Sequence, residues 1–218
     1  DNLINELIKL ESQYPEFQDQ NSPSRRVGGG LSDKFNSESH IFQMYSLDNT
    51  YSDTELETWF NRIVKLIQVD DFEFCCELKY DGASVNLLYE DGQLVRALTR
   101  GDGYQGDNIT NNLKTINSIP LKLKNKFFPN KFEIRGEIII PSDAFNSLNE
   151  KRKQIGLPLF MNPRNTASGS IKLLDSKEVA RRPLECFLYS LVSNDININN
   201  HSELSLIHIS EPTRRNSI

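Results

Sequence analysis

The dipeptide Asp91-Gly92 restricts the fold of this chain more than any other feature, because it predicts a tight turn between two strands. The type I′ hairpin loop, for which Asp-Gly is a preferred sequence, needs positive φ angles at both central positions. The residues on either side, 84–90 and 93–100, are predicted as strands. Together they indicate an antiparallel hairpin and argue against an all-helical fold.

Other segments add strands and helices to this hairpin. Residues 74–78, 131–140 and 184–192 are predicted as strands. Residues 2–13 place apolar side chains at helical spacing, and residues 142–155 are also predicted as a helix. Strands mixed with helices and joined partly by a tight hairpin predict an α+β fold with a mostly antiparallel sheet.

A third helix has the clearest beginning. Ser52 followed by Glu55 forms a capping box, which marks a helix N-terminus. An apolar stripe follows on one face, and we expect it to pack in the core. The stripe consists of Leu56, Trp59, Phe60, Ile63, Val64 and Ile67.

Composition narrows the class of protein. The chain has 218 residues, 37% of them hydrophobic, which is enough for one sizeable core. It has no run of 18 apolar residues, so no membrane span is expected. The net charge of −5 argues mildly against a dedicated nucleic-acid binder but allows a local basic groove. The three cysteines form no CxxC pair, which indicates reduced thiols in a cytosolic protein rather than a zinc site.

The segment from Glu77 to Gly82 is the sharpest chemical feature. Lys79 ends a predicted strand, and Asp81-Gly82 favours a turn directly after it. This arrangement holds the amine on a rigid edge, as a nucleophile needs. A free lysine amine is protonated at neutral pH, so burial, neighbouring cations or a phosphate-bound metal must assist it. The alternative is an ordinary surface lysine before a turn.

Three further segments carry polar residues that suit a ligand. Arg100 lies in the Gly-rich run 99–103, where it could reach a phosphate or ribose, although a plain turn is the alternative. Arg135 and Glu137 interrupt an apolar strand and need a partner or ligand if buried. Residues 162–170 combine one arginine with small side chains, which suits contact with a nucleic-acid backbone or, equally, a helix-capping loop.

The order of these motifs closely resembles bacterial NAD-dependent DNA ligases. The resemblance covers residues 1 to about 203, including the linker at 22–28. ATP-dependent ligases and messenger-RNA capping enzymes share the lysine motif but not the first and last signatures. The motifs are SLDN (Ser46–Asn49), CELKYDG (Cys76–Gly82), TRGDG (Thr99–Gly103), RGE (Arg135–Glu137) and NPRN (Asn162–Asn165).

The resemblance implies the nucleotidyltransferase (adenylation) fold of the covalent ligases and a three-step reaction. Lys79 would attack the α-phosphorus of NAD and release nicotinamide mononucleotide (NMN). The AMP would pass to the 5′-phosphate of a DNA nick, and the 3′-hydroxyl would then displace it. The implied setting is DNA replication and repair by a monomeric bacterial enzyme in the cytoplasm. Its partners would be NAD and nicked double-stranded DNA, with no membrane.

The resemblance also assigns roles to individual residues. Lys79 and Asp81 would be catalytic, with Asp81 orienting the lysine or its metal. The NAD-binding residues would be Ser46, Leu47, Glu77 (on the adenine), Arg100 (on ribose or phosphate) and Glu137 (on the ribose).

Metal and DNA contacts are implied in the same way. Mg²⁺ or Mn²⁺ is expected because charge builds on phosphate oxygens, and Glu137 would help to place it. Arg164 and Lys172 would lie toward DNA. Many relatives have arginine at the position of Lys172, so a bidentate phosphate contact is lost while the charge stays. Gln43-Met44-Tyr45 replaces the usual Pro-Met-Leu, which affects packing under the pocket rather than the chemistry.

The resemblance divides the chain into three parts. Residues 1–32 would be a remnant of the N-terminal NMN-binding subdomain with its linker, and 33–203 a truncated adenylation domain. Later pocket lysines, the OB-fold and a zinc-binding region of the family have no counterpart in the chain. Residues 204–214, LSLIHISEPTR, match the translation of a sequencing adapter, so we expect 204–218 to be a non-native tail; the alternative is an ordinary strand and loop.

Two other functions stay open at this stage. An ATP-dependent ligase or a capping-type nucleotidyltransferase would use the same lysine with a different nucleotide. A non-catalytic fragment would bind DNA nicks whether or not Lys79 is present. We also expect the 218-residue chain by itself to be inactive in full ligation, since parts of the family's pocket are missing from it.

Overall fold

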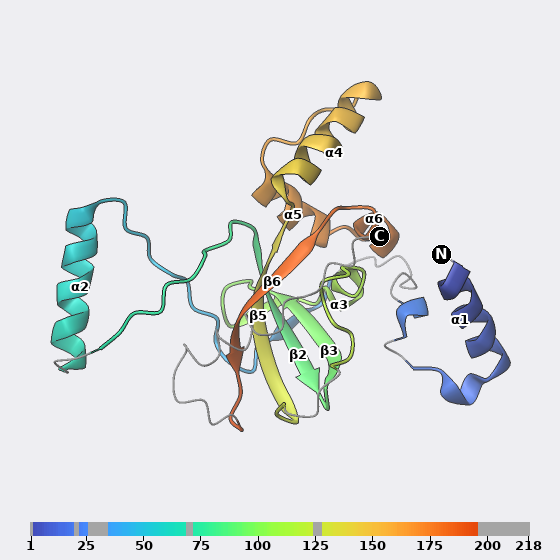
Figure 1. The fold of residues 1–218 in the computed structure, drawn as a ribbon, viewed down its shortest axis with the longest axis horizontal. Coiled ribbons are helices and arrows are strands. Elements are labelled where there is room, and N and C mark those ends of the chain that lie inside the picture. The colour runs from blue at the N-terminus through green and yellow to red at the C-terminus, as the bar shows by residue number, and fades with distance from the viewer. Residues whose placement is uncertain (1, 20–21, 26–34, 69–71, 124–127, 196–218) are drawn as a thin grey trace.

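An antiparallel four-stranded sheet forms the centre of the molecule (Figure 1). The computed structural model describes residues 2–19, 22–25, 35–68, 72–123 and 128–195. The strand order is β3-β2-β5-β6, and all three pairings are antiparallel. The strands are β2 (Ala83–Glu90), β3 (Gln93–Thr99), β5 (Lys131–Ile139) and β6 (Glu185–Val192). The predicted α+β class, and the strands predicted at these positions, are confirmed.

The predicted hairpin joins β2 to β3. Glu90 pairs with Gln93, so Asp91 and Gly92 are the only loop residues. Both have positive φ, 49° and 74°. These values are those that the mirror-image turns of tight hairpins require, which explains why Asp-Gly predicted the turn correctly.

The two faces of the sheet differ in character. Val85, Leu87 and Tyr89 alternate along β2 and are buried on one face together with Ile138 of β5. Short helices and loops cover this apolar face: α3 (Thr110–Leu113), α5 (Pro163–Ile171), α6 (Ser176–Ala180) and residues 114–121. The opposite face carries polar side chains and holds the pocket described below.

Residues 37–49 cross the polar face. Their first part is β1 (Ser37–Ser39), which pairs antiparallel with β4 (Gln105–Asp107) in a separate two-stranded sheet. We call residues 40–44, which follow β1, the strap. The chain then passes Ser46 and Leu47 on its way to α2 (Asp53–Ile67).

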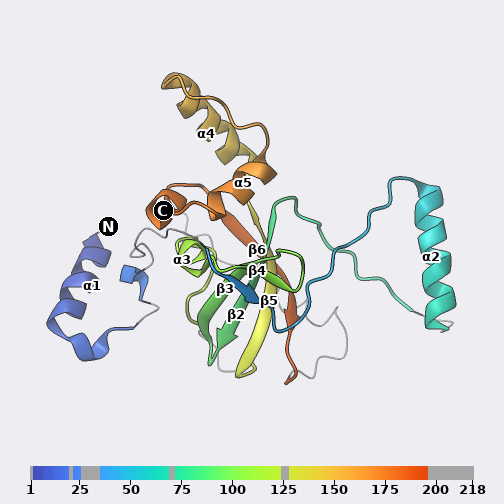
Figure 2. The ribbon, with the colours of Figure 1, turned by 180° about the vertical axis from the view of Figure 1, so that it is seen from behind.

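Helix α2 begins as predicted but packs differently. The Ser52 hydroxyl accepts from the Glu55 N–H at 3.3 Å, and the Glu55 carboxylate accepts from the Tyr51 N–H at 2.6 Å. The expectation that its apolar stripe lies in the core is wrong, because no described residue of α2 is buried. The helix stands away from the sheet in both views (Figures 1 and 2). Phe60 is 42% exposed and makes ring contacts only with Phe72 and Phe74 among the described residues.

The strand predicted over residues 74–78 is also wrong. These residues are exposed and take part in no strand pairing among the described part of the chain. Alternating or apolar sequence marks a segment that can be a strand, but a strand also needs a partner edge.

Two further helices, α1 and α4, agree with their predicted ranges to within one residue. Helix α1 (Asn2–Gln13) is followed by two 3-10 turns, η1 (Pro15–Phe17) and η2 (Pro23–Arg25), which it contacts. Helix α4 (Ser142–Gln154) begins after Pro141. Within the described ranges, none of the helices is long and apolar enough to cross a bilayer.

A matched pair of leucines tests this division between core and exposed face. We expect Leu87→Ala to lower the free energy of unfolding by about 2–5 kcal/mol, because a fully buried side chain leaves a cavity. Leu87 is 0% exposed, whereas Leu56 on α2 is 51% exposed. Leu56→Ala should therefore cost less than about 1 kcal/mol. Chemical denaturation of both variants measures the difference, and equal losses would show that the α2 face is buried.

Candidate active site

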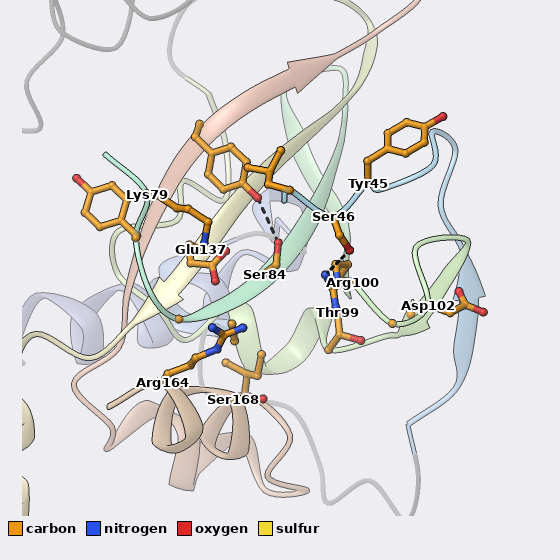
Figure 3. Close-up of a pocket in the computed structure, with 18 of the residues that line it drawn as sticks. Tyr45, Ser46, Lys79, Ser84, Thr99, Arg100, Asp102, Glu137, Arg164 and Ser168 are labelled. Atoms are coloured by element: carbon orange, nitrogen blue, oxygen red, sulfur yellow. Dashed lines mark hydrogen bonds between the residues drawn. The ribbon is translucent and has the colours of Figure 1, made fainter. Parts of the chain in front are cut away.

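One pocket of about 790 Å³ collects most of the predicted site residues (Figure 3). It opens on the polar face of the sheet, where β2 and β5 meet the segment 77–82. The predicted residues that line it are Ser46, Leu47, Glu77, Lys79, Arg100, Glu137, Arg164 and Lys172. Residues from five separate stretches of sequence therefore share one cavity.

Lys79 lies on the extended segment that leads into β2. It is exposed and points into the pocket beside Glu137 (Figure 3). The next residue, Tyr80, stacks on Phe187 of β6, with ring centroids 4.2 Å apart and planes at 18°. This stacking fixes the backbone directly after Lys79.

Gly82 brings the same segment against the sheet. A Cβ at this position would stand 2.1 Å from the carbonyl oxygen of Ile138, the residue that follows Glu137 on β5. Only glycine permits this approach of two backbones. The missing side chain at Gly82 thus lets the Lys79 segment pack directly against the strand that carries Glu137.

Asp81 contacts the helix α5. Its carboxylate pairs with the Arg164 guanidinium at 2.9 Å, and both side chains are more than half exposed. An exposed pair of this kind contributes little to stability. Asp81 lines a neighbouring pocket with Arg164 rather than the pocket of Lys79, so its predicted role on the lysine stays a prediction.

Glu137 is a half-buried carboxylate on the wall of the pocket. Burial raises its pKa above the ordinary value of 4.5, while a hydrogen bond from the Gly82 N–H and the charges of Arg164 and Lys79 act in the opposite direction. Its ionised form is therefore partly desolvated and faces two cations. Such a group can hold a ribose hydroxyl or a metal ion.

This burial predicts a pH-dependent effect of Glu137→Gln. Because the folded state holds the proton more tightly than the unfolded state, the unfolded chain ionises first as pH rises from 4.5, and folding stability falls across that window. The glutamine variant lacks this loss. At neutral pH we expect this variant to unfold at the same or a higher temperature than the parent. The difference in unfolding temperature should become smaller as the pH falls. A variant that is less stable by the same amount at every pH would contradict this.

Arg100 and Ser46 meet at the other wall of the pocket. The Arg100 Nη1 donates to the Ser46 Oγ at 3.0 Å. Gly101 and Gly103 have positive φ, 58° and 95°, which makes the turn after Arg100 tight. Asp102 closes that turn by accepting from the backbone N–H groups of Gln105 and Tyr104, which lowers its pKa. The plain-turn alternative therefore describes 101–103, whereas Arg100 itself faces the cavity.

Arg164 and Lys172 lie at the two ends of α5. The Asn162 side chain caps this helix by accepting from the Asn165 N–H at 2.7 Å, so the capping alternative for this segment is correct. Arg164 also lines the pocket, and Lys172 pairs with Asp107 of β4 at 2.7 Å. The residues expected to face DNA and those expected to hold NAD thus border one cavity.

Sequence reasoning missed several residues that line the pocket. Tyr189 is one of them; its hydroxyl lies 3.2 Å from the Ser84 Oγ. Tyr189 sits in a mostly apolar strand between Leu188 and Ser190, and nothing in that pattern indicated a site. Ser84, Thr99, Asp107 and Ser168 also line the cavity.

Comparison with known proteins now decides the family. Residues 32–211 match the family model described as the NAD-dependent DNA ligase adenylation domain. The chain belongs to this family. Residues 1–28 match a second description, the DNA ligase-like, N-terminal NAD⁺-binding domain. The predicted resemblance is confirmed, and NAD is supported over ATP as the nucleotide of this ligase family.

Several bacterial proteins named DNA ligase are close relatives of this adenylation domain. The chain is 54% identical over 200 residues to one from Christiangramia forsetii and 53% identical over 200 residues to one from Flavobacterium psychrophilum. A third, from Phocaeicola vulgatus, is 50% identical over 203 residues. These alignments cover 92% or 93% of the chain but only 30% of each relative. The predicted division at residues 32 and 203 stays a prediction, and residues 204–218 lie outside the described residues.

Proposed function

We propose that this adenylation domain accepts AMP from NAD on Lys79, as the first step of NAD-dependent DNA ligation. The observation that carries the proposal is the pocket itself. It gathers Lys79, Glu137 and Arg100 in a chain whose family is defined by NAD-dependent adenylation.

The chemistry assigned to Lys79 is nucleophilic. Its Nζ, once deprotonated, attacks the α-phosphorus of NAD; a P–N bond forms, the pyrophosphate P–O bond breaks, and NMN leaves with the electron pair. Arg164 faces Glu137 across the cavity and supplies positive charge near the transferring phosphate. Asp81, paired with Arg164, holds that arginine at the pocket edge.

The remaining pocket residues would bind the nucleotide. Glu77 is assigned to the adenine, Glu137 to the ribose, and Arg100 to ribose or phosphate, all from positions on the pocket wall. Ser46 and Leu47 also line the pocket. Hydrogen bonds from charged side chains to phosphate and hydroxyl groups give such a site its orientation.

A magnesium ion is part of the proposal. The described residues contain no group of three carboxylate, histidine or cysteine side chains that could hold a metal. Proteins bind Mg²⁺ through one or two carboxylates together with substrate phosphates, so the proposal needs only one carboxylate from the pocket. Glu137 is the carboxylate assigned to it, and the ion, when bound, would neutralise charge on the phosphate oxygens.

The later steps would act on nicked double-stranded DNA. Arg164 and Lys172, at the ends of α5, are the cations proposed to reach its phosphates. Because the chain spans only 30% of its relatives, sealing of nicks, a monomeric state and a bacterial cytoplasmic location are all proposed for the whole protein.

Labelled nucleotides test the proposal. The enzyme for this test is a chimeric ligase, in which the 200 residues of this chain that match the Christiangramia forsetii relative replace their counterparts in that relative. NAD labelled in its AMP half should give a covalently labelled protein, and ATP labelled at the α-phosphate should not. Labelling by ATP alone would favour the capping-type or ATP-dependent alternative. Labelling by neither, with nick binding unaffected by Lys79→Ala, would favour a non-catalytic fragment.

A further inference from the structure

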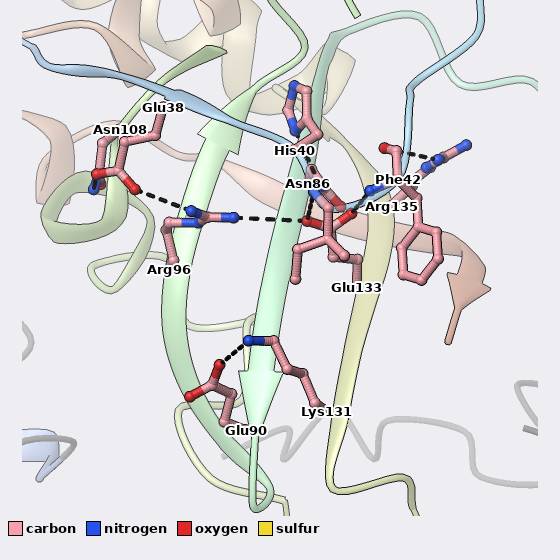
Figure 4. Close-up of polar contacts among 12 residues, drawn as sticks. Glu38, His40, Phe42, Asn86, Glu90, Arg96, Asn108, Lys131, Glu133 and Arg135 are labelled. Carbon is pink, nitrogen blue, oxygen red and sulfur yellow. Dashed lines mark hydrogen bonds and ion pairs between the residues drawn. The ribbon is translucent and has the colours of Figure 1, made fainter. Parts of the chain in front are cut away.

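The strap is held by a single buried carboxylate on the sheet (Figure 4). The Glu133 Oε1 accepts from the Ile41 N–H at 2.9 Å, and its Oε2 accepts from the Phe42 N–H at 3.1 Å. Glu133 lies on β5, and its side chain points to the polar face, four residues before Glu137 on the same strand. Each oxygen therefore fixes one strap residue.

Glu133 is an unusual residue to find fully buried. Its side chain is 0% exposed, and a buried carboxylate is unfavourable unless its charge is paired and hydrogen-bonded. The Arg96 guanidinium lies 3.8 Å away and also pairs with Glu38 of β1 at 3.0 Å. The ion pair with Arg96 and the two backbone N–H donors together satisfy the Glu133 carboxylate. They also tie β1 and the strap to the same place on the sheet.

A second charged residue of β5 holds the carbonyl groups of the strap. The Arg135 Nη2 donates to the Gln43 carbonyl at 2.7 Å and to the Phe42 carbonyl at 3.4 Å. Met44 is buried, and its N–H donates to the Gly103 carbonyl at 2.9 Å. The strap is thus fixed at each residue from Ile41 to Met44, two positions before Ser46.

His40 connects the strap to the opposite wall of the pocket. Its Nε2 lies 3.0 Å from the Arg100 carbonyl oxygen, so this nitrogen carries the proton and donates. Its Nδ1 then accepts from the Asn86 amide at 3.1 Å. The Arg100 guanidinium in turn donates to Ser46, so hydrogen bonds connect His40 of the strap to Ser46 through Arg100.

We propose that Glu133 is a positioning residue for the nucleotide pocket. It does not line the cavity, but it fixes the strap, and the strap sets where Ser46 and Arg100 stand. The identity of the nucleotide rests on the proposed function; the effect of Glu133 on Ser46 does not. Arg135 has the same role through the carbonyl groups.

Glu133→Gln tests the proposal, since it keeps the shape of the side chain but can accept only one of the two N–H groups. Glu90→Gln is the matched control, because Glu90 lies on the same sheet in a partly exposed pair with Lys131. Two measurements are made on the full chain, both well below its unfolding temperature. The first is the backbone amide NMR shifts of residues 44–47, and the second is the affinity for AMP by calorimetry.

We expect Glu133→Gln to shift the Ser46 and Leu47 amides and to weaken AMP binding about tenfold, the effect of one lost charge-assisted hydrogen bond. Glu90→Gln should change neither. A Glu133→Gln chain that is less stable but keeps its amide shifts and AMP affinity would overturn the proposal. If the parent chain binds no AMP, the amide shifts alone decide the role of Glu133, and the proposed function is decided separately by the labelling of the chimeric ligase.

Arg135→Lys covers the case in which Glu133→Gln does not fold. Lysine keeps the charge but cannot reproduce the geometry of the guanidinium, so the hydrogen bonds to the Gln43 and Phe42 carbonyls become weaker. The same amides should shift, by less than in Glu133→Gln, with a few-fold weaker AMP affinity. Unchanged amide shifts in Arg135→Lys would overturn the proposal.

Discussion

Lys79→Ala is expected to abolish the transfer of AMP from NAD to the chimeric ligase. The variant keeps the pocket walls but removes the amine of Lys79, the residue before Tyr80, whose ring stacks on β6. Without a nucleophile no P–N bond forms, so covalent labelling should fall at least ~10³-fold, to background. Gel electrophoresis after incubation with labelled NAD measures it.

Two further lysine variants separate chemistry from charge. Lys79→Arg keeps the positive charge, but a guanidinium stays protonated and is not a nucleophile, so it should be as inactive as alanine. Lys65→Ala removes an exposed lysine from the last turn of α2, outside the pocket, and should label normally. Covalent labelling that persists in Lys79→Ala, or that is lost equally in Lys65→Ala, would contradict the assignment.

Gly82→Ala is expected to have the second-largest effect. The new Cβ would stand 2.1 Å from the Ile138 carbonyl oxygen and 2.8 Å from the Ile139 side chain, so the backbone must move. Moving the Lys79 segment by about 1 Å should reduce labelling about 100-fold. The overpacking should also lower the free energy of unfolding by about 1–3 kcal/mol.

Gly169→Ala is the matched control for this change. Gly169 lies in α5, and a Cβ there would meet nothing within 4 Å. Alanine favours a helix over glycine, so stability should stay the same or rise by up to about 1 kcal/mol, with labelling unchanged. Equal losses in the two glycine variants would show that close packing at Gly82 does not position the lysine.

The sequence predicted those elements whose signals are local. The Asp91-Gly92 turn, the Ser52 cap and the strand over 131–140 depend on neighbouring residues, and the structure has them. The apolar stripe of α2 and the strand over 74–78 were mispredicted for a shared reason. Burial and strand pairing depend on a second surface, and a periodic pattern says only that a segment could use one.

The residues of the candidate site also divide into those that a local motif predicts and those that only the tertiary structure reveals. Lys79, Arg100 and Glu137 stand in short motifs, so resemblance could select them before any geometry was known. The contacts of Glu133 with residues 41 and 42 join positions more than ninety apart, and the register of β5 decides them. A buried glutamate in a predicted strand gives no sign of which backbone it holds.

Peptide mapping of the labelled chimeric ligase tests the central claim most directly. After incubation with NAD and Mg²⁺, the protein is digested at neutral to alkaline pH, because a phosphoramidate is labile in acid, and the AMP-bearing peptide is sequenced by mass spectrometry. We expect AMP on Lys79 and on no other residue of this chain. AMP found instead on Lys172, or on a residue outside the pocket, would contradict it.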